Sequence, residues 1–337
     1  MTILQNVSLR PYNTFGMDVA ATHFTVFNDL QQIQELSSMA WMYPKKYIVG
    51  GGSNILLTQP LEGLVIKNEW KGIALVDESD EHVWLQVNAG EIWHDTVLYA
   101  ISKGWGGMEN LSLIPGCVGA APMQNIGAYG VEVKELIDEV VAWHWEENRF
   151  IALKNEDCQF GYRDSIFKQA LKEKVLITSV VFRLSKKPKL NTTYGAIQQQ
   201  LEKMGVHKPT IKTVSDAVIA IRTSKLPNPK DIGNAGSFFK NPVIHKAQFL
   251  SLQQQYPAIV GHASGDDTIK VAAGWLIEQA GWKGYKKGAA GVHDKQALVL
   301  VNHGGASGME VYDLSSDIIT SVHYQFGIML EREVQIW

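Results

Sequence analysis

Cysteine is scarce in this chain of 337 residues and occurs only as Cys117 and Cys158. The two lie far apart without CxxC spacing, which argues against a disulfide framework and against a structural zinc site. The ten histidines form no HExxH or HxH pattern, so no metal ligand set is indicated. We therefore expect a protein of the reducing cytoplasm that works without a metal.

Long apolar runs and dense basic runs are also missing. Nowhere do about 18 apolar residues follow one another, and the segment 1–18 lacks the basic start and apolar stretch of a signal peptide. The net charge of -3 and the absence of a Lys/Arg run argue against a nucleic-acid partner. The hydrophobic fraction of 45% is that of an ordinary globular protein, and the length favours two or three domains around a shared cleft.

Short apolar segments between turn residues predict an α+β fold. Alternation at 83–87 predicts a strand, and further strands are expected at 24–27, 47–49, 55–57, 63–66, 140–144, 175–183, 297–301 and 328–336. Helical spacing predicts helices at 31–39, 93–101, 214–221 and 271–280. Ser307 and Glu310 fit a capping box that opens a helix carrying Val311, Leu314, Ile318 and Val322.

Two glycine-rich segments are candidates for binding a cofactor. The first, Gly50 to Asn54, follows an apolar strand and would let backbone N–H groups approach a phosphate. It has neither the GKS/T ending nor the GxGxxG spacing of the common nucleotide loops, and a plain tight turn is the alternative. The second, Leu111 to Gly130, could cradle a flat ring and a pyrophosphate, or could be an Ω-loop packed on itself. Together the two segments favour a dinucleotide cofactor.

Three further places could carry chemistry. Arg163, in Gly161-Tyr162-Arg163-Asp164, could steady a developing anion or could make a structural ion pair. Ser237 follows small residues and precedes two phenylalanines, a setting in which a serine could donate a proton in a dry pocket. Glu331 and Glu333 are expected on one face of the last strand, where alternation cannot choose between them and solvated edge carboxylates are the alternative.

Taken in order, these motifs resemble the UDP-N-acetylenolpyruvoylglucosamine reductase (UDP-N-acetylmuramate dehydrogenase) family, from Arg10-Pro11-Tyr12-Asn13-Thr14-Phe15-Gly16 to Glu333-Val334. The resemblance implies three domains. Residues 1–68, completed by a C-terminal strand at 330–337, and residues 69–221 would form an FAD-binding module of the PCMH/vanillyl-alcohol-oxidase type. Residues 222–329 would form an α+β substrate-binding domain, and a change in composition at 222–232 agrees with a boundary there.

The resemblance also implies which residues bind FAD. They are the two glycine-rich segments and two arginines: Val49, Gly50, Gly51, Gly52, Ser53, Asn54, Pro115, Gly116, Gly119, Ala120, Asn125, Ile126, Gly127, Ala128, Tyr129, Gly130, Arg163 and Arg222.

The family's reaction would be the NADPH-dependent reduction of UDP-N-acetylglucosamine enolpyruvate to UDP-N-acetylmuramate, a step of peptidoglycan synthesis and hence of cell-wall biogenesis, cell shape and division. NADPH would reduce the flavin, and flavin N5 would pass hydride to the substrate. Ser237 would supply the proton to carbon, while Arg163 and Glu333 would stabilise the enol-like species. The substrate-binding positions matched by the resemblance are Tyr194, Lys225, Asn241, Lys270 and Gln296.

Tyr194 matches the tyrosine that covers the substrate in one of two family subtypes, so the chain resembles that subtype, and a monomer is expected. Two departures stand out. Arg332 occupies a position where relatives often carry proline, and a substrate-contacting tyrosine is replaced near His262. The alternatives are a flavin-dependent oxidase of the same FAD-binding fold and a non-catalytic nucleotide-binding regulator.

Overall fold

The computed structural model describes residues 1–337, apart from the side chain of Ala40. The chain forms two compact units. The first comprises Met1–Val7, Ala21–Gly51 and Leu61–Ser224, and the second comprises Ser8–Ala20, Gly52–Pro60 and Lys225–Trp337. Helices and strands are mixed in both, which confirms the predicted α+β class.

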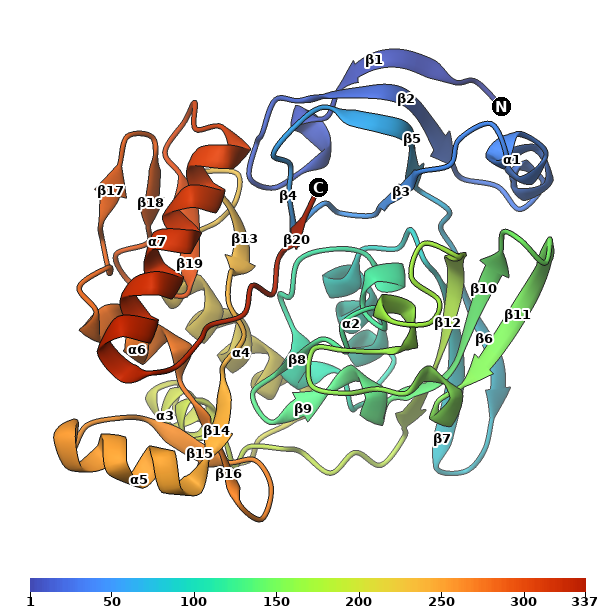
Figure 1. Ribbon diagram of the computed structural model, residues 1–337. Helices are drawn as coiled ribbons and strands as arrows, with labels where there is room; N and C mark the ends of the chain where they lie inside the picture. The colour runs from blue at the N-terminus through green and yellow to red at the C-terminus, as the bar shows by residue number, and fades with distance from the viewer. The chain divides into compact units, whose positions relative to one another are not determined.

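The first unit contains two sheets (Figure 1). The smaller sheet has the order β1-β2-β5-β3, formed by Leu4–Ser8, Ala20–Phe27, Leu61–Asn68 and Lys46–Val49. Its β2, β5 and β3 run parallel, and α1 (Gln32–Ala40) packs its Ile33 and Leu36 into a core with Phe27 and Leu64. The predicted strands at 24–27, 47–49 and 63–66 and the helix at 31–39 are confirmed.

The larger sheet of this unit is antiparallel in the order β11-β10-β12-β7-β6. Its strands span Arg149–Lys154, Ile137–His144, Val175–Ser185, His82–Asn88 and Ile73–Glu78. Central β12 is rich in β-branched residues and is buried along nearly its whole length. In β7 the residues Val83, Leu85 and Val87 alternate into the core, where Trp93 and Val97 of α2 (Trp93–Ser102) meet them.

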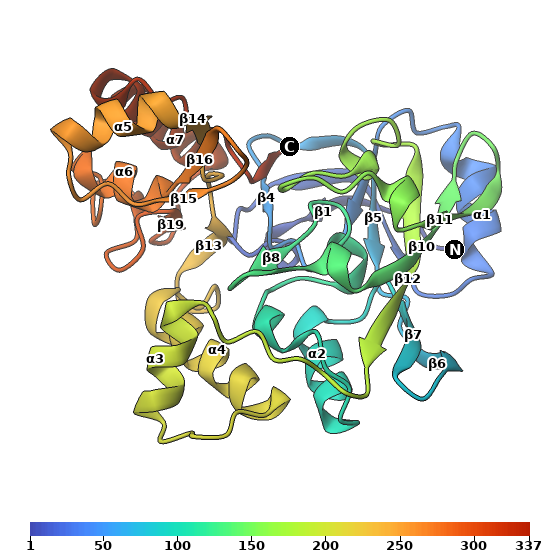
Figure 2. The same cartoon turned by 90° about the horizontal axis from the view of Figure 1, so that it is seen from below.

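Two helices close the first unit side by side (Figure 2). They are α3 (Gly195–Lys203) and α4 (Ile211–Lys225), and they share a small core that includes Ile197, Leu201, Val214 and Val218. The helix predicted at 214–221 is thus confirmed, although it extends by about one turn at each end. Between α2 and β10 the chain makes only one-turn helices and the short hairpin β8 (Gly127–Ala128) and β9 (Val131–Glu132).

In the second unit, α7 (Gly308–Phe326) packs on a four-stranded sheet (Figure 1). The sheet has the order β13-β19-β18-β17, from Gly233–Ser237, Val299–Asn302, Ala290–Val292 and Lys286–Lys287. The capping box is confirmed, because Ser307 Oγ accepts from Glu310 N at 3.2 Å and Glu310 Oε2 accepts from Ser307 N at 2.7 Å. The four residues predicted to face inward from this helix are fully buried.

A three-stranded sheet, β14-β16-β15, completes this unit with α5 (Lys246–Gln255) and α6 (Ala273–Gln279). Its strands are Val243–His245, Thr268–Val271 and Gly261–Ala263. The predicted helix at 271–280 begins later than expected, because Val271 ends β16. No helix among the described residues combines the length and the apolar character needed to cross a membrane.

The prediction of a continuous C-terminal strand at 328–336 is wrong. Only β20 (Gln335–Ile336) is regular strand, paired in parallel with β4 (Ile55–Leu56), and a single bridge joins Phe239 to Arg332. Arg332 is instead held by α7: Nε donates to Ser315 Oγ at 2.7 Å, Nη2 donates to Ser316 Oγ at 2.6 Å, and the guanidinium lies 4.3 Å from the centre of the Tyr312 ring. These contacts hold the segment in an irregular conformation before its last residues pair with β4.

Two glycines that open helices predict opposite effects of substitution. A Cβ on Gly308, the first residue of α7, would lie 1.8 Å from Leu57 O, whereas a Cβ on Gly195, the first residue of α3, would meet nothing within 4 Å. We expect Gly308→Ala to destabilise the protein by about 2 kcal/mol or more, and Gly195→Ala to be neutral or slightly stabilising. Thermal melts of the two variants test this; equal midpoints would contradict the packing of Leu57 on α7.

Candidate functional site

The two glycine-rich segments meet in the first unit. A Cβ on Gly51 would lie 2.8 Å from Gly116 Cα, and a Cβ on Gly50 would lie 3.2 Å from Cys117 Cβ. Only residues without side chains allow two backbones to approach this closely. The structure therefore brings together the ends of two segments, 49–54 and 111–130, that the sequence predicts to bind one cofactor.

Leu113 marks the start of the second segment and has a left-handed backbone, with φ of 58°. Its N–H donates to His94 Nδ1 at 3.0 Å, and its carbonyl oxygen accepts from Arg222 Nε at 3.2 Å. The segment is thus held from both α2 and α4. His94 is a residue that sequence reasoning missed, because nothing in the periodicity of α2 distinguishes it from a surface histidine.

Arg222 lies in a cluster with two tyrosines. Its guanidinium hydrogen-bonds the Tyr129 side chain, and the Tyr129 ring packs edge-on against Tyr194, with ring centres 5.4 Å apart. Burial lowers the pKa of Arg222, and the charge of Arg163 acts in the same direction. Burial likewise raises the pKa of Tyr129, so its hydroxyl stays protonated. The cluster joins two predicted flavin residues to the predicted substrate-covering tyrosine.

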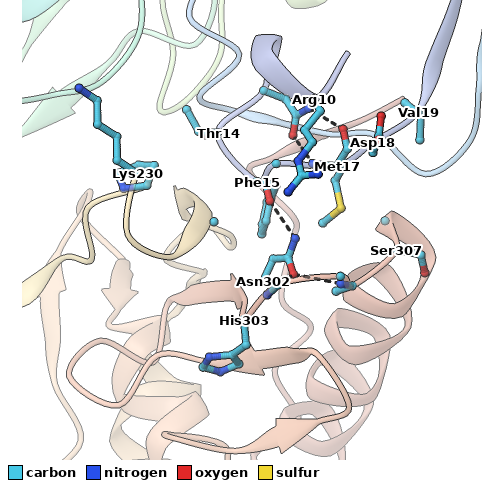
Figure 3. A pocket seen from close by; sticks show the side chains of 18 of the residues that line it. Arg10, Thr14, Phe15, Met17, Asp18, Val19, Lys230, Asn302, His303 and Ser307 are labelled. Atoms are coloured by element: carbon cyan, nitrogen blue, oxygen red, sulfur yellow. Dashed lines mark hydrogen bonds between the residues drawn. The ribbon is translucent and has the colours of Figure 1, made fainter. Parts of the chain in front are cut away.

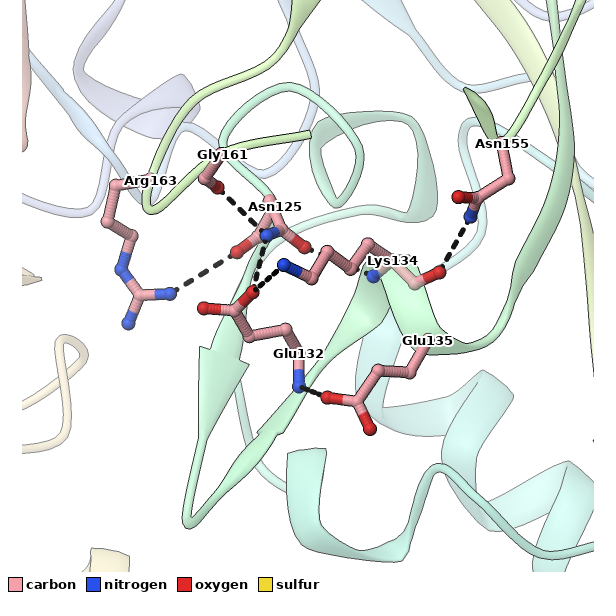
Figure 4. Close-up of polar contacts among 7 residues, drawn as sticks. All are labelled: Asn125, Glu132, Lys134, Glu135, Asn155, Gly161 and Arg163. Atoms are coloured by element: carbon pink, nitrogen blue, oxygen red, sulfur yellow. Dashed lines mark hydrogen bonds and ion pairs between the residues drawn. The ribbon is translucent and has the colours of Figure 1, made fainter. Parts of the chain in front are cut away.

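Arg163 is anchored on the second segment (Figure 4). Its Nη1 donates to Asn125 O at 3.3 Å and its Nη2 donates to Gly127 O at 2.8 Å. Asn125 is fully buried, and its Nδ2 donates to Gly161 O at 2.9 Å and to Glu132 Oε2 at 2.9 Å. Arg163 itself has a left-handed backbone, with φ of 55°. The turn at 161–164 is therefore fastened to the predicted flavin segment by both the main chain and the side chains.

Ser237 ends β13 in the second unit, next to a bulge. The register against β19 slips between Asn234 and Ser237, and Gly236 there has φ of 69°. Asn234 fixes the turn because its Oδ1 accepts from Gly236 N at 3.0 Å. Ser237 is half-buried, whereas Phe238 and Phe239 after it are buried. The bulge thus places Ser237 at the end of β13, directly before two buried phenylalanines.

The two C-terminal glutamates differ in their surroundings. The Glu331 side chain is 72% exposed and pairs with Lys240 Nζ at 3.0 Å. Glu333 is half-buried, and its N–H donates to Phe238 O at 2.8 Å, one residue after Ser237 in the chain. Asn54, of the first glycine-rich segment, donates through Nδ2 to Glu333 O at 3.3 Å. Both glutamates therefore lie along the segment that follows Ser237, with Glu333 bonded to Phe238 and Glu331 bonded to Lys240, further from Ser237 in the chain.

Three predicted substrate residues surround the start of α6. Asn241 Oδ1 accepts from Ala273 N at 3.0 Å, and Gln296 lies against Gly274, where an added Cβ would be 3.1 Å from Oε1. Lys270 pairs with Val243, two residues after Asn241. Lys225 is exposed at the end of α4, away from this group along the chain. His262 is also exposed and pairs with Lys270 across β15 and β16.

A separate pocket of about 740 Å³ opens in the second unit (Figure 3). Arg10, residues 13–19, the glycines at 304 and 305 and the start of α7 are among the residues that line it. Asn302 spans its floor, with Nδ2 donating to Phe15 O at 3.0 Å and Oδ1 accepting from Gly304 N at 2.9 Å. Neither Ser237 nor Glu333 is among the described residues that line it, so this pocket is distinct from the predicted catalytic groups.

The first unit has the groups that an FAD molecule needs. Closely approaching glycine backbones suit an anionic diphosphate, and a half-buried arginine beside a tyrosine suits the polar atoms of a flavin ring. Two features on which that fit depends come from the structure itself: the clash that a Cβ would cause at Gly51 and the hydrogen bond of Arg222 with Tyr129.

Comparisons with known proteins agree with an FAD-binding protein. A profile of the C-terminal domain of UDP-N-acetylenolpyruvoylglucosamine reductase matches residues 228–337, and a profile of an FAD binding domain matches residues 23–144. The UDP-N-acetylenolpyruvoylglucosamine reductase of Flavobacterium johnsoniae is 46% identical over 100% of both chains. That of Chromobacterium violaceum is 50% identical over 97% of both.

Among solved structures, UDP-N-acetylenolpyruvylglucosamine reductase from Thermus caldophilus superposes with a TM-score of 0.70 at 24% identity, covering 100% of this chain and 99% of the other. That likeness supports the fold. With the relatives above, it confirms the predicted α+β FAD-containing oxidoreductase. The chain belongs to the UDP-N-acetylenolpyruvoylglucosamine reductase family.

Proposed function

We propose that this protein reduces UDP-N-acetylglucosamine enolpyruvate to UDP-N-acetylmuramate with NADPH, in peptidoglycan precursor synthesis. The observation that carries the proposal is the setting of Ser237. Ser237 is half-buried next to a bulge at Gly236 and is followed by the buried Phe238 and Phe239, and the N–H of Glu333 donates to the carbonyl oxygen of Phe238. We further propose that the enzyme acts as a cytoplasmic monomer, with the three domains that the sequence predicts.

FAD would be held by the two glycine-rich segments and by Arg222. The chemistry it supplies when bound is hydride transfer, taken from NADPH and delivered from N5 to the terminal vinyl carbon of the enolpyruvyl group. Addition of hydride at that carbon leaves negative charge on the neighbouring carbon and on its carboxylate. The residues of the chain then have to stabilise this charge and supply one proton.

Arg163 is proposed to stabilise the carboxylate. Its guanidinium carries a fixed positive charge, and its bonds to Asn125 O and Gly127 O set its orientation before substrate arrives. Such preorganised donors lower a barrier because they need no rearrangement as charge develops. Glu333, in its protonated form, would donate a hydrogen bond to the same enol-like species.

Ser237 is proposed to donate its hydroxyl proton to the neighbouring carbon, which keeps its ether oxygen. The new C–H bond completes the saturated product, and the serine oxygen regains a proton from solvent. A hydroxyl is a weak acid, but a carbanionic carbon is a strong base, so proton transfer between them is feasible.

The substrate's diphosphate and uridine would be held by Lys225, Asn241, Lys270 and Gln296, and its sugar portion would be covered by Tyr194. The grouping of Asn241, Lys270 and Gln296 at the start of α6 supports one continuous subsite. The edge-on contact of Tyr194 with Tyr129 supports its assignment to the subtype with a covering tyrosine.

Replacing Ser237 by alanine separates the two half-reactions. We expect Ser237→Ala to leave flavin reduction by NADPH within about twofold of wild type and to slow reoxidation by the enolpyruvyl sugar by about 100-fold or more. Stopped-flow absorbance of the flavin measures both rates. Ser251→Ala, on the exposed face of α5, is the control, and equal loss in both half-reactions would remove Ser237 from the role of proton donor.

The glutamates give a second test. We expect Glu333→Gln to slow reoxidation by about 10-fold or more, because the variant loses an acidic proton, and Glu331→Gln to change it less than about twofold, because Glu331 is a solvated ion pair. The same stopped-flow assay measures the reoxidation rate of both variants. A larger effect at Glu331 would reverse the assignment, and rapid wild-type reoxidation by oxygen alone would favour an oxidase instead.

A further inference from the structure

Leu113 has both of its backbone polar groups bound by side chains from different helices. His94 of α2 accepts from its N–H at 3.0 Å, and Arg222 of α4 donates to its carbonyl oxygen at 3.2 Å. Leu113 also has φ of 58°, a conformation that a leucine adopts at a cost of about 1 kcal/mol or more. Such a residue keeps this backbone only where its surroundings hold it there.

The hydrogen bond from Leu113 fixes the chemical state of His94. A ring nitrogen can accept only when it carries no proton, so Nδ1 is bare and the single proton of the neutral ring sits on Nε2. In a doubly protonated imidazole, Nδ1–H would face the N–H of Leu113, and no hydrogen bond could form between two donors. The interaction therefore exists only with neutral histidine.

The charges around His94 favour that neutral form. Burial lowers the pKa of His94, Asp95 on the same helix opposes this, and Arg222 facing it from α4 adds to the lowering. At neutral pH the ring is thus an acceptor. As pH falls below the ordinary histidine value of about 6.5, the native state is progressively weakened, and the loss is complete below the lowered pKa of the folded protein.

We propose that His94 is a positioning residue for FAD: its neutral ring holds Leu113 left-handed, and the Leu113 carbonyl in turn aims Arg222 and its partner Tyr129 at the flavin. The inference rests on the role proposed for Arg222 in binding FAD. His94 acts through Leu113 and Arg222, so it takes no part in hydride or proton transfer. It adds a pH limit to cofactor retention that the proposed catalytic residues do not supply.

Release of FAD from the purified holoenzyme tests this without any substrate. Free FAD fluoresces more strongly than bound flavin, so the release rate after dilution is read directly between pH 5.5 and pH 8. We expect wild-type release to accelerate about tenfold toward the acid end, the effect of losing one hydrogen bond between half-buried groups. His94→Leu should release FAD about tenfold faster than wild type at pH 8, with little further change on acidification.

His94→Asn is the decisive variant, because its Oδ1 can take the place of Nδ1 and does not titrate. We expect it to retain FAD as wild type does at pH 8 and to lose the acid acceleration. His82→Asn, on β7 outside this cluster, should keep the wild-type profile. A wild-type pH profile in His94→Asn, or wild-type release at pH 8 from His94→Leu, would overturn the inference.

Failure of the proposed function would look different. An enzyme that holds FAD with the expected pH dependence but does not turn over the enolpyruvyl sugar would contradict the reaction and leave the role of His94 intact. Normal turnover with unaltered FAD release in the His94 variants would contradict the role of His94 and leave the proposed reaction intact. Because His94→Asn retains the hydrogen bond, it also reports on the proposal if His94→Leu fails to fold.

Discussion

A left-handed backbone at residues other than glycine is the constraint on which the candidate site of the first unit depends. Leu113, Asn125, Tyr129 and Arg163 have φ values of 58°, 44°, 51° and 55°. Each conformation is disfavoured for a residue with a side chain, and such strain persists only where surrounding contacts impose it. Their occurrence together in the predicted flavin and catalytic segments indicates that folding energy is used to set the geometry of this site.

Most of the contacts that hold these residues come from distant parts of the chain. His94 and Arg222 hold Leu113; the amide of Asn110 donates to Tyr129 O at 3.1 Å; Lys168 Nζ donates to Arg163 O at 2.9 Å. Asn125 supplies its own side chain, which ties the 161–164 turn to β9. The loops around the site therefore need the surrounding sheet and helices in place before they can take up their conformations.

This dependence explains what could be predicted from the sequence. The capping box at Ser307, the alternation in β7 and the apolar face of α2 follow from residues within one or two turns of each other, and all three appear as predicted. The glycine-rich segments could be identified by composition. The close approach of Gly51 to Gly116, which lie 65 positions apart in the chain, could not be predicted from composition.

The same reasoning accounts for the two places where sequence patterns fell short. Alternation could not rank Glu331 and Glu333, because the distinction comes from Lys240, which pairs with Glu331, and from Phe238, which binds the Glu333 backbone. The predicted C-terminal strand failed because Arg332 binds serines of α7 instead of continuing a ladder. The prediction of catalytic positions therefore drew on the family resemblance, and the structure contributes the physical difference between the two carboxylates.

Two arginines concentrate positive charge in the candidate site of the first unit. Arg163 and Arg222 lie close enough that the charge of the first lowers the pKa of the second, and burial acts in the same direction. Two guanidinium groups held in this way repel each other at a cost to the free protein, and an anionic group bound between or beside them removes part of that cost. Since a ligand that binds only the native state stabilises it by mass action, an anionic cofactor held by these two arginines would stabilise the first unit.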